Sequence, residues 1–370
     1  MNDNYESNLK DILFFRELLF LHTPSGYEKF CNPNLEILLS KWIPTIPYKI
    51  DNIGNITWKR GSMNDDALKI MLSAHYDENA LQVVNVRDDG MLNVINLGGI
   101  DKKTILGSHV YVVSDRFDNN KRVFIPGIIG KKPIHKETKE EREKVDDFDQ
   151  ILVDIGAKSK DEVRNTGIHV GSPIVFKKNA DISFGINNNL IVSNGLDDKV
   201  GIYIISHVFN IINDEDLINK NIQLILCWTS QEEVGLRGAG ISAKQINPDI
   251  SIDVDVTFDT SKSTAISKAK CGDIELGKGV TLEYGPHTNY NIVADLKDIC
   301  NRYALCYQEQ VSKVGGNNTS AIQSNSLNCL SAHLGIPQKN MHTQVEVCHW
   351  DDIKSCIDLI IYYINEKISN

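Results

Sequence analysis

The chain lacks the sequence features of secreted, membrane-spanning and disulfide-stabilised proteins. Its N-terminal residues 1–10 do not show the basic and then apolar pattern of a secretory signal. No apolar run is long enough to cross a bilayer. Eight cysteines are scattered over 370 residues without a C-x-x-C spacing, which favours reduced core residues over disulfides or zinc ligands. We therefore expect a soluble, cytoplasmic protein that does not contact a membrane.

Positive charge is also scarce. Asp and Glu number 49 against 39 Lys and Arg, which gives a net charge of -10. A general nucleic-acid binder needs clustered basic residues to neutralise phosphates, so we expect no nucleic-acid partner. The hydrophobic fraction of 41% and the charged fraction of 24% are ordinary globular values. A chain of this length predicts one large domain and a second, smaller one.

The pattern along the chain changes twice and indicates two kinds of structure. Residues 1–82 and 180–370 alternate helix-like stretches with apolar, strand-like runs such as 67–74 and 222–228, which is typical of an α/β domain. Between residues 83 and 179 the runs are short and are separated by Asp, Gly and Asn. We therefore predict a discontinuous α/β domain, 1–82 and 180–370, with a small β domain, 83–179, inserted in it.

Two adjacent carboxylates, Glu232 and Glu233, follow the apolar run 222–228. Such a run is typical of a buried strand, and open α/β sheets place their chemistry beyond the carboxyl ends of strands. Neighbouring side chains do not point at one atom with equal ease. One carboxylate can therefore bind a metal ion while the other stays free as a base, which is the division of roles that a water-activating hydrolase needs.

A histidine and two further carboxylates lie at other predicted element ends. His75 follows the strand-like run 68–73, and Asp77, two residues on, can accept the second ring N–H of that histidine. Asp197 and Asp198 lie at a loop-to-helix junction, where a simple helix cap is an equally good interpretation.

The second half of the chain adds another set of candidates. Asp253 and Asp255 interrupt a β-branched, strand-like run at 250–257, and carboxylates on a buried strand are costly unless they are paired or metal-bound. His342 follows the apolar run 329–336. One histidine, three carboxylates and a second histidine match the ligands of two divalent ions bridged by one carboxylate. Such ligands suit zinc, cobalt or manganese, although the spacing alone leaves the number of ions open.

Seven short motifs occur in order along nearly the whole chain. In this order they resemble the dinuclear metallo-aminopeptidases that assemble as tetrahedral (TET) particles, which include glutamyl and deblocking aminopeptidases. The motifs are Ser-Gly-Tyr-Glu at 25–28, Ala-His-Tyr-Asp-Glu at 74–78, Leu-Gly-Gly-Ile-Asp at 97–101, Gly-Ile-Ile-Gly-Lys-Lys-Pro at 127–133, Val-Asp-Ile-Gly-Ala at 153–157, Leu-Asp-Asp-Lys-Val-Gly at 196–201 and Gln-Glu-Glu-Val-Gly at 231–235.

The resemblance implies both a fold and a set of residue roles. The fold would be an α/β catalytic domain, a mixed sheet with helices on both faces, plus an inserted β-barrel, PDZ-like dimerisation domain. Asp253 would be a non-ligand. His75 and Asp255 would bind one metal ion, Glu233 and His342 the other, Asp197 would bridge both, Glu232 would be the general base, and Asp77 would orient His75.

Some positions depart from the family pattern. Relatives usually carry Gly-Gly-Thr-Asp where this chain has Gly-Gly-Asn317-Asn318, and Arg-Tyr where it has Lys339-Asn340. Asn79-Ala80 replaces a common Ile-Gly or Val-Gly. None of these residues is an implied ligand, so we expect the departures to bear on substrate preference.

The sequence therefore predicts a metal-dependent aminopeptidase that removes N-terminal residues from peptides. It would use two divalent ions, zinc or cobalt in the first place and manganese as a further option. The resemblance also implies self-association to dimers and to a tetrahedral dodecamer. Two alternatives stay open at this point. Some relatives have been labelled endoglucanases, which would need two carboxylates and no metal, and a weakly active homologue could serve as a metal-dependent assembly or binding protein.

Overall fold

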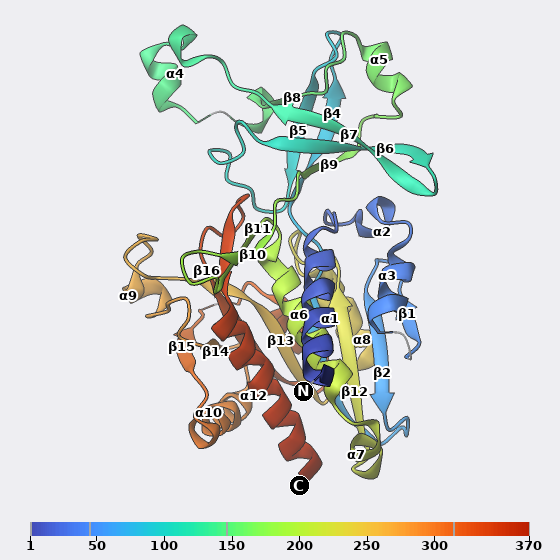
Figure 1. Cartoon of the computed structure of the whole chain (residues 1–370), viewed down its shortest axis with the longest axis vertical. Coiled ribbons are helices and arrows are strands. Elements are labelled where there is room, and N and C mark those ends of the chain that lie inside the picture. Colours follow the sequence, from blue (N-terminus) through green and yellow to red (C-terminus); the bar gives the residue numbers. More distant parts are fainter. Residues whose placement is uncertain (1, 44–45, 146, 314, 370) are drawn as a thin grey trace.

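The protein consists of a β-barrel and a larger, layered part. The computed structural model describes residues 2–43, 46–145, 147–313 and 315–369. In Figure 1 the barrel lies at the top, and a sheet with its covering helices lies below it. The predicted fold class is confirmed, because the chain forms an eight-stranded mixed sheet and a separate, closed, six-stranded barrel.

The large sheet has a parallel centre and antiparallel edges. Its four central strands, β12, β3, β13 and β16, run parallel, while β2 and β14 pair with them in the antiparallel sense. Every residue of β12 is buried, which is expected of a strand covered on both faces. In spatial order the strands are β1 (Tyr48–Ile50), β2 (Ile56–Gly61), β12 (Ile222–Thr229), β3 (Leu68–His75), β13 (Ile250–Phe258), β16 (Leu330–Gln338), β14 (Val280–Tyr284) and β15 (Tyr307–Val311).

Helices cover both faces of this sheet. One face packs into the main hydrophobic core together with α1 (Asn2–Leu19), α3 (Leu35–Trp42), α6 (Leu196–Ile211), α10 (Tyr290–Tyr303) and α12 (Trp350–Ser369). The other face packs Met71 of β3 and Ile225 of β12 against α8 (Arg237–Ile246) and α11 (Asn318–Asn325). Odd-numbered β3 residues therefore face α8 and α11, whereas Ile70, Leu72 and Ala74 face the larger core.

The barrel has an apolar interior of its own and joins the sheet part through two chain segments. Its strands run from Ala80 to Phe176, and whether this part folds as an independent domain with the boundaries 83–179 stays a prediction. In barrel order the strands are β4 (Ala80–Val86), β5 (Leu92–Leu97), β8 (Leu152–Asp154), β7 (Lys121–Ile129), β6 (His109–Asp118) and β9 (Pro173–Phe176).

Short elements complete the fold. A three-stranded sheet, β10 (Asp181–Phe184), β11 (Leu190–Ser193) and β17 (Glu346–His349), lies where the chain returns from the barrel. No helix in the described ranges is both long enough and apolar enough to span a membrane. The remaining helical segments are α2 (Glu28–Cys31), η1 (Ile134–Lys136), α4 (Lys139–Glu143), η2 (Phe148–Gln150), α5 (Lys160–Asn165), α7 (Asp214–Asn219) and α9 (Lys268–Cys271).

Candidate metal centre and active site

The carboxyl ends of the parallel strands bring the predicted site residues together. Strands β12, β3, β13 and β16 end at the same edge of the sheet, because parallel strands share a direction. Chain segments separated by up to 267 positions, from 75 to 342, therefore meet there. One cavity of about 520 Å³ is lined by six of the predicted residues: His75, Asp197, Glu232, Glu233, Asp255 and His342.

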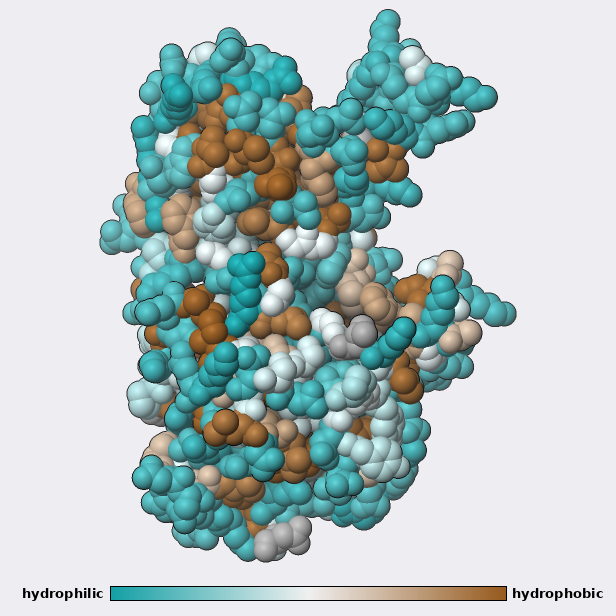
Figure 2. All heavy atoms as spheres, turned by 180° about the vertical axis from the view of Figure 1, so that it is seen from behind, coloured by the Kyte–Doolittle hydropathy of each residue, from teal (hydrophilic) through white to brown (hydrophobic). Residues whose placement is uncertain are grey.

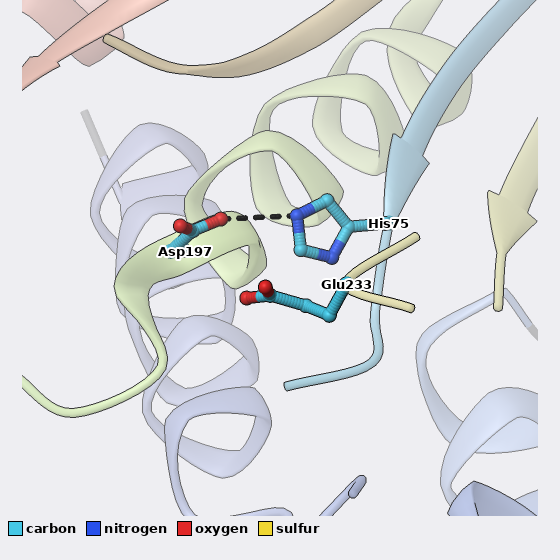
Figure 3. Close-up of side chains that lie close together, drawn as sticks. All are labelled: His75, Asp197 and Glu233. Carbon is cyan, nitrogen blue, oxygen red and sulfur yellow. Dashed lines mark hydrogen bonds and ion pairs between the residues drawn. The ribbon is translucent and has the colours of Figure 1, made fainter. Parts of the chain in front are cut away.

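Asp197 lies between the two histidines. Its Oδ1 is 3.0 Å from His75 Nε2, and its Oδ2 is 3.1 Å from His342 Nε2. Figure 3 shows the first of these contacts, with the Glu233 side chain extending toward the same space. Each oxygen of one carboxylate thus faces a different imidazole, which is the geometry that a bridging ligand needs.

Asp255 and the two glutamates surround the same imidazoles. Asp255 Oδ1 lies 3.7 Å and Glu232 Oε2 lies 3.9 Å from His75 Nε2. Glu233 Oε1 lies 3.7 Å from His342 Nε2 and also accepts a hydrogen bond of 2.7 Å from Asn79 Nδ2. Each glutamate is therefore nearest to a different histidine.

Asp77 holds the segment that carries both glutamates. Its carboxylate accepts the backbone N–H of Glu232 at 2.9 Å and that of Glu233 at 3.3 Å. The nearest oxygen to His75 Nδ1 is instead the backbone carbonyl of Asp77 at 3.0 Å, while the Asp77 carboxylate is 3.7 Å away. A carbonyl can orient a ligating imidazole as a carboxylate does. Asp77 thus contacts His75 through its carbonyl and the backbone of Glu232 and Glu233 through its carboxylate.

The other carboxylates of these motifs have structural partners. Asp198, which is buried, accepts the backbone N–H of His75 at 3.3 Å and that of Gly201 at 3.0 Å. Asp253 accepts hydrogen bonds from Ser73 Oγ at 2.6 Å and Thr319 Oγ1 at 3.3 Å. Neither lines the cavity with the candidate ligands.

Glu346 is a site residue that the sequence analysis missed. Its Oε2 accepts the backbone N–H of Leu196 at 2.8 Å and that of Asp197 at 3.3 Å, and its Oε1 accepts the N–H of His342 at 3.0 Å. One buried carboxylate thus fixes the backbone beneath two candidate ligands from distant segments. A lone Glu between Val345 and Val347 was the available signal, because a carboxylate in an apolar run needs a partner.

The barrel contributes to the wall of the site. Gly98 and Gly99, in the connection between β5 and β6, approach Glu233 and His342. A Cβ on Gly99 would lie 2.9 Å from His342 Nδ1, which is closer than packed atoms allow. Gly98 also has a φ of +82°, a conformation that side chains disfavour. This close approach explains the two glycines of the motif at 97–101.

The carboxylates of the cluster repel one another in a buried setting. Burial, with repulsion from Asp255, raises the pKa of Glu232 well above its ordinary value. Burial, with repulsion from Asp197, raises the pKa of Glu233 well above its ordinary value and that of Asp255 to about 7. Burial also acts to raise the pKa of Asp197, but hydrogen bonds from the two histidines outweigh it and hold that pKa below its usual range. The cluster thus buries more negative charge than two imidazoles offset.

This set of donor atoms fits divalent metal ions. His75, Asp197 and Glu233 offer ligand atoms within 4.8 Å of one another, and so do His75, Glu232 and Asp255. Imidazole nitrogens combined with carboxylate oxygens suit zinc, cobalt and manganese. Cations at this place would also offset the repulsion among the buried carboxylates. The residues present are therefore suited to hold such ions.

Comparison with known proteins identifies the family. The sequence profile of the M42 glutamyl aminopeptidases matches residues 54–359, which is most of the chain. The chain belongs to the M42 aminopeptidase family. It is thus a metallo-exopeptidase, a hydrolase of peptide bonds. The resemblance found in the sequence is confirmed.

Individual relatives agree with this assignment over nearly their full length. The lysyl aminopeptidase of Pyrococcus furiosus is 28% identical over 338 residues, 90% of this chain and 91% of that protein. The solved aminopeptidase APDkam598 of Desulfurococcus kamchatkensis is 28% identical, with a TM-score of 0.83 over 96% of this chain and 94% of that one. PhTET1-12s, a dodecamer, is 26% identical, with a TM-score of 0.78 over 95% of this chain and 98% of that one.

Proposed function

We propose that this M42 enzyme is an aminopeptidase with two divalent ions, which His75, Asp255, Glu233 and His342 would hold and Asp197 would bridge. The observation that carries the proposal is the Asp197 carboxylate, whose two oxygens contact different histidines at 3.0 and 3.1 Å. Zinc or cobalt is the expected metal, with manganese as a further option. When bound, such ions lower the pKa of water to about 7 and polarise the scissile carbonyl.

Glu232 is the proposed general base. It lies beside His75 without a hydrogen bond to it, at 3.9 Å, and its backbone N–H is held by Asp77. The side chain is thus placed next to the candidate ligands. In the reaction its carboxylate would accept a proton from the attacking water and later give a proton to the amine that leaves.

The acidic ligands also support exopeptidase action. The cavity wall contains four carboxylates of the proposed centre, Asp197, Glu232, Glu233 and Asp255, and no lysine or arginine of the described chain lines it. A free α-ammonium group on the substrate would be attracted to such a wall. An internal peptide bond has no such group, so cleavage at the N-terminus is favoured.

Self-association is the second part of the proposal. The relative PhTET1-12s is a dodecamer, and Figure 2 shows hydrophobic atoms gathered on the barrel end of this chain. Exposed apolar side chains of the barrel include Val84, Ile95 and Ile128, which are 46 to 49% exposed. We propose dimers through the barrel and a tetrahedral dodecamer built from them. The proposed location of the enzyme is the cytoplasm.

Removal of metal tests the catalytic proposal. Dialysis against a chelator is expected to abolish hydrolysis of amino-acid p-nitroanilides, and zinc, cobalt or manganese is expected to restore it, because the base alone cannot activate water at neutral pH. Full activity of protein shown to be metal-free would contradict the proposal. The same treatment distinguishes an aminopeptidase from a glycosidase, because two carboxylates flanking a sugar need no metal, so a glycosidase would stay active after chelation.

A further inference from the structure

A row of buried polar residues crosses four strands beside the proposed metal centre. Strand pairing places Ser73 of β3 next to Asp253 of β13, and Asp253 next to His333 of β16. The antiparallel pairing of Thr281 with Gly335 and Leu282 with Leu334 then brings Glu283 of β14 beside His333. Because paired residues share a face, all four side chains lie on one face of the sheet. His333 and Glu283 also line the cavity.

Glu283 has one occupied and one free oxygen. Its Oε1 accepts hydrogen bonds from His287 Nε2 at 2.6 Å and Asn317 Nδ2 at 3.2 Å. Within the described chain no donor lies at hydrogen-bond distance from Oε2. The residue is only 5% exposed and borders the cavity. Oε2 is accessible from the cavity and not enclosed by protein, so a cationic ligand group that donates to it would form a charge-assisted hydrogen bond there.

Glu283 lies beside two histidines, His287 and His333, and is the carboxylate of the row that lines the cavity. Burial acts to raise its pKa, but the nearby His333 and the hydrogen bonds from His287 and Asn317 outweigh it and lower that pKa. Burial acts to lower the pKa of His333, yet Glu283 and Asp253 raise it to about 9. Its Nδ1 faces Asp253 Oδ2 at 3.4 Å. His333 therefore lies between the carboxyl groups of Asp253 and Glu283, and only Glu283 of these two lines the cavity.

We propose that Glu283 recognises the side chain of the substrate's N-terminal residue and that the enzyme favours a cationic side chain, such as that of lysine or arginine. The inference rests on the proposed function, because the substrate must first be placed at the metal centre. An acidic side chain would need a cation in this wall. Apart from the proposed ligands His75 and His342, the described lining offers only His333, which Asp253 already faces.

Asn317 fits this assignment. Its side-chain amide donates a hydrogen bond to Glu283 and holds Oε1 in place. The free Oε2 is thereby left for the substrate. An aspartate or glutamate at this position would instead repel Glu283.

Two substrates with the same number of side-chain carbons provide the test. Lysine p-nitroanilide and norleucine p-nitroanilide have the same carbon chain and differ by the ammonium group. The metal-loaded wild-type enzyme is expected to cleave the lysine substrate with a kcat/KM at least about tenfold higher, the value of one charge-assisted hydrogen bond. In Glu283→Gln this ratio should fall about 10- to 100-fold, while the metal content stays the same. Glu283→Lys should invert the order of lysine and glutamate substrates.

Glu309→Gln is the matched control. Glu309 lies on the neighbouring β15, pairs with Lys297 at the surface and does not line the cavity, so its replacement should leave the lysine-to-norleucine ratio unchanged. A wild-type preference for norleucine or glutamate would overturn the proposal. An unchanged ratio in Glu283→Gln would overturn it as well.

A binding measurement separates this inference from the proposed function. Calorimetry on the metal-loaded protein should show free lysine binding more tightly than norleucine, and Glu283→Gln should remove the difference. If no aminoacyl substrate is cleaved but lysine is still bound selectively through Glu283, the catalytic proposal fails and the recognition proposal stands. Equal binding of lysine and norleucine to the wild-type protein would overturn the recognition proposal.

Discussion

The barrel and the sheet part bury very different side chains. The barrel interior is made of Leu, Ile, Val and Phe side chains, such as Leu81, Val112 and Ile174. The strand-end edge of the sheet, by contrast, buries histidines and carboxylates, among them His75, Asp197 and Asp255. Burying ionisable groups costs free energy. The difference indicates that the sheet edge is built for ligands, and that the barrel interior is built for stability.

The barrel also contributes to the candidate active site. Its connection at Gly98 and Gly99 packs against Glu233 and His342. A second link lies where the chain enters and leaves the barrel, where Glu78 pairs with Lys178 and Lys199. The barrel and the sheet part thus meet at the active site and in a buried ionic cluster, and they also share an apolar contact in which Cys31 packs against Val113 and Val175 of the barrel.

Removing the charge of Glu78 should have the largest effect on stability. Its Oε1 accepts the N–H of Thr23 at 2.8 Å, and its Oε2 pairs with Lys178 and, at 2.9 Å, with Lys199. Glu78→Gln would leave two buried ammonium groups without their carboxylate, which costs about 3–5 kcal/mol. Urea unfolding measures the change. In the exposed control Glu36→Gln, whose partner Lys29 is 3.9 Å away, the loss should be about 0–1 kcal/mol.

The pH dependence of this effect has a definite sign. Burial acts to raise the pKa of Glu78, but the two lysines outweigh it and hold that pKa well below its ordinary value. A depressed pKa in the folded state contributes stability above the unfolded pKa of about 4.3, and this contribution is lost as the pH falls below it. The difference between wild type and Glu78→Gln should therefore shrink in acid. A difference that grows below pH 4 would contradict the role of this cluster.

Replacing Glu346 should have a smaller and more local effect. Glu346→Gln leaves only one acceptor oxygen beneath Asp197 and His342, so the backbone of one of these two candidate ligands loses its hydrogen bond. Changes of this kind lower metal affinity about 10- to 100-fold. Competition with a chelator for zinc or cobalt measures it, with Glu309→Gln as the control. Unchanged affinity would show that the site does not depend on this contact.

The sequence places His75 and Glu232 near strand ends, because an apolar run shows where a strand ends, and the structure has His75 as the last residue of β3 and Glu232 three residues after β12. Asp255 is singled out differently, because it interrupts a β-branched run. The sequence pattern does not predict contacts that depend on strand pairing. Nothing local places Glu283 beside His333, since that contact requires β14 to pair with β16 in one register.

The sequence does not predict the direction of a side chain either. The Asp77 carboxylate was expected to face His75, yet its hydrogen bonds go to the N–H groups of Glu232 and Glu233. Spacing fixes which residues are near, and rotamers decide which atoms meet. Whether Asp77 orients His75 during catalysis stays a prediction.

The metal content of two variants tests the central claim most directly, because the claim assigns different roles to adjacent glutamates. Measured by elemental analysis, Glu232→Gln should keep both ions and lose turnover, since its amide cannot accept the proton of water. Glu233→Gln should lose one of the two ions. If instead Glu232→Gln lost metal and Glu233→Gln kept both ions, the assignment of base and ligand would be wrong.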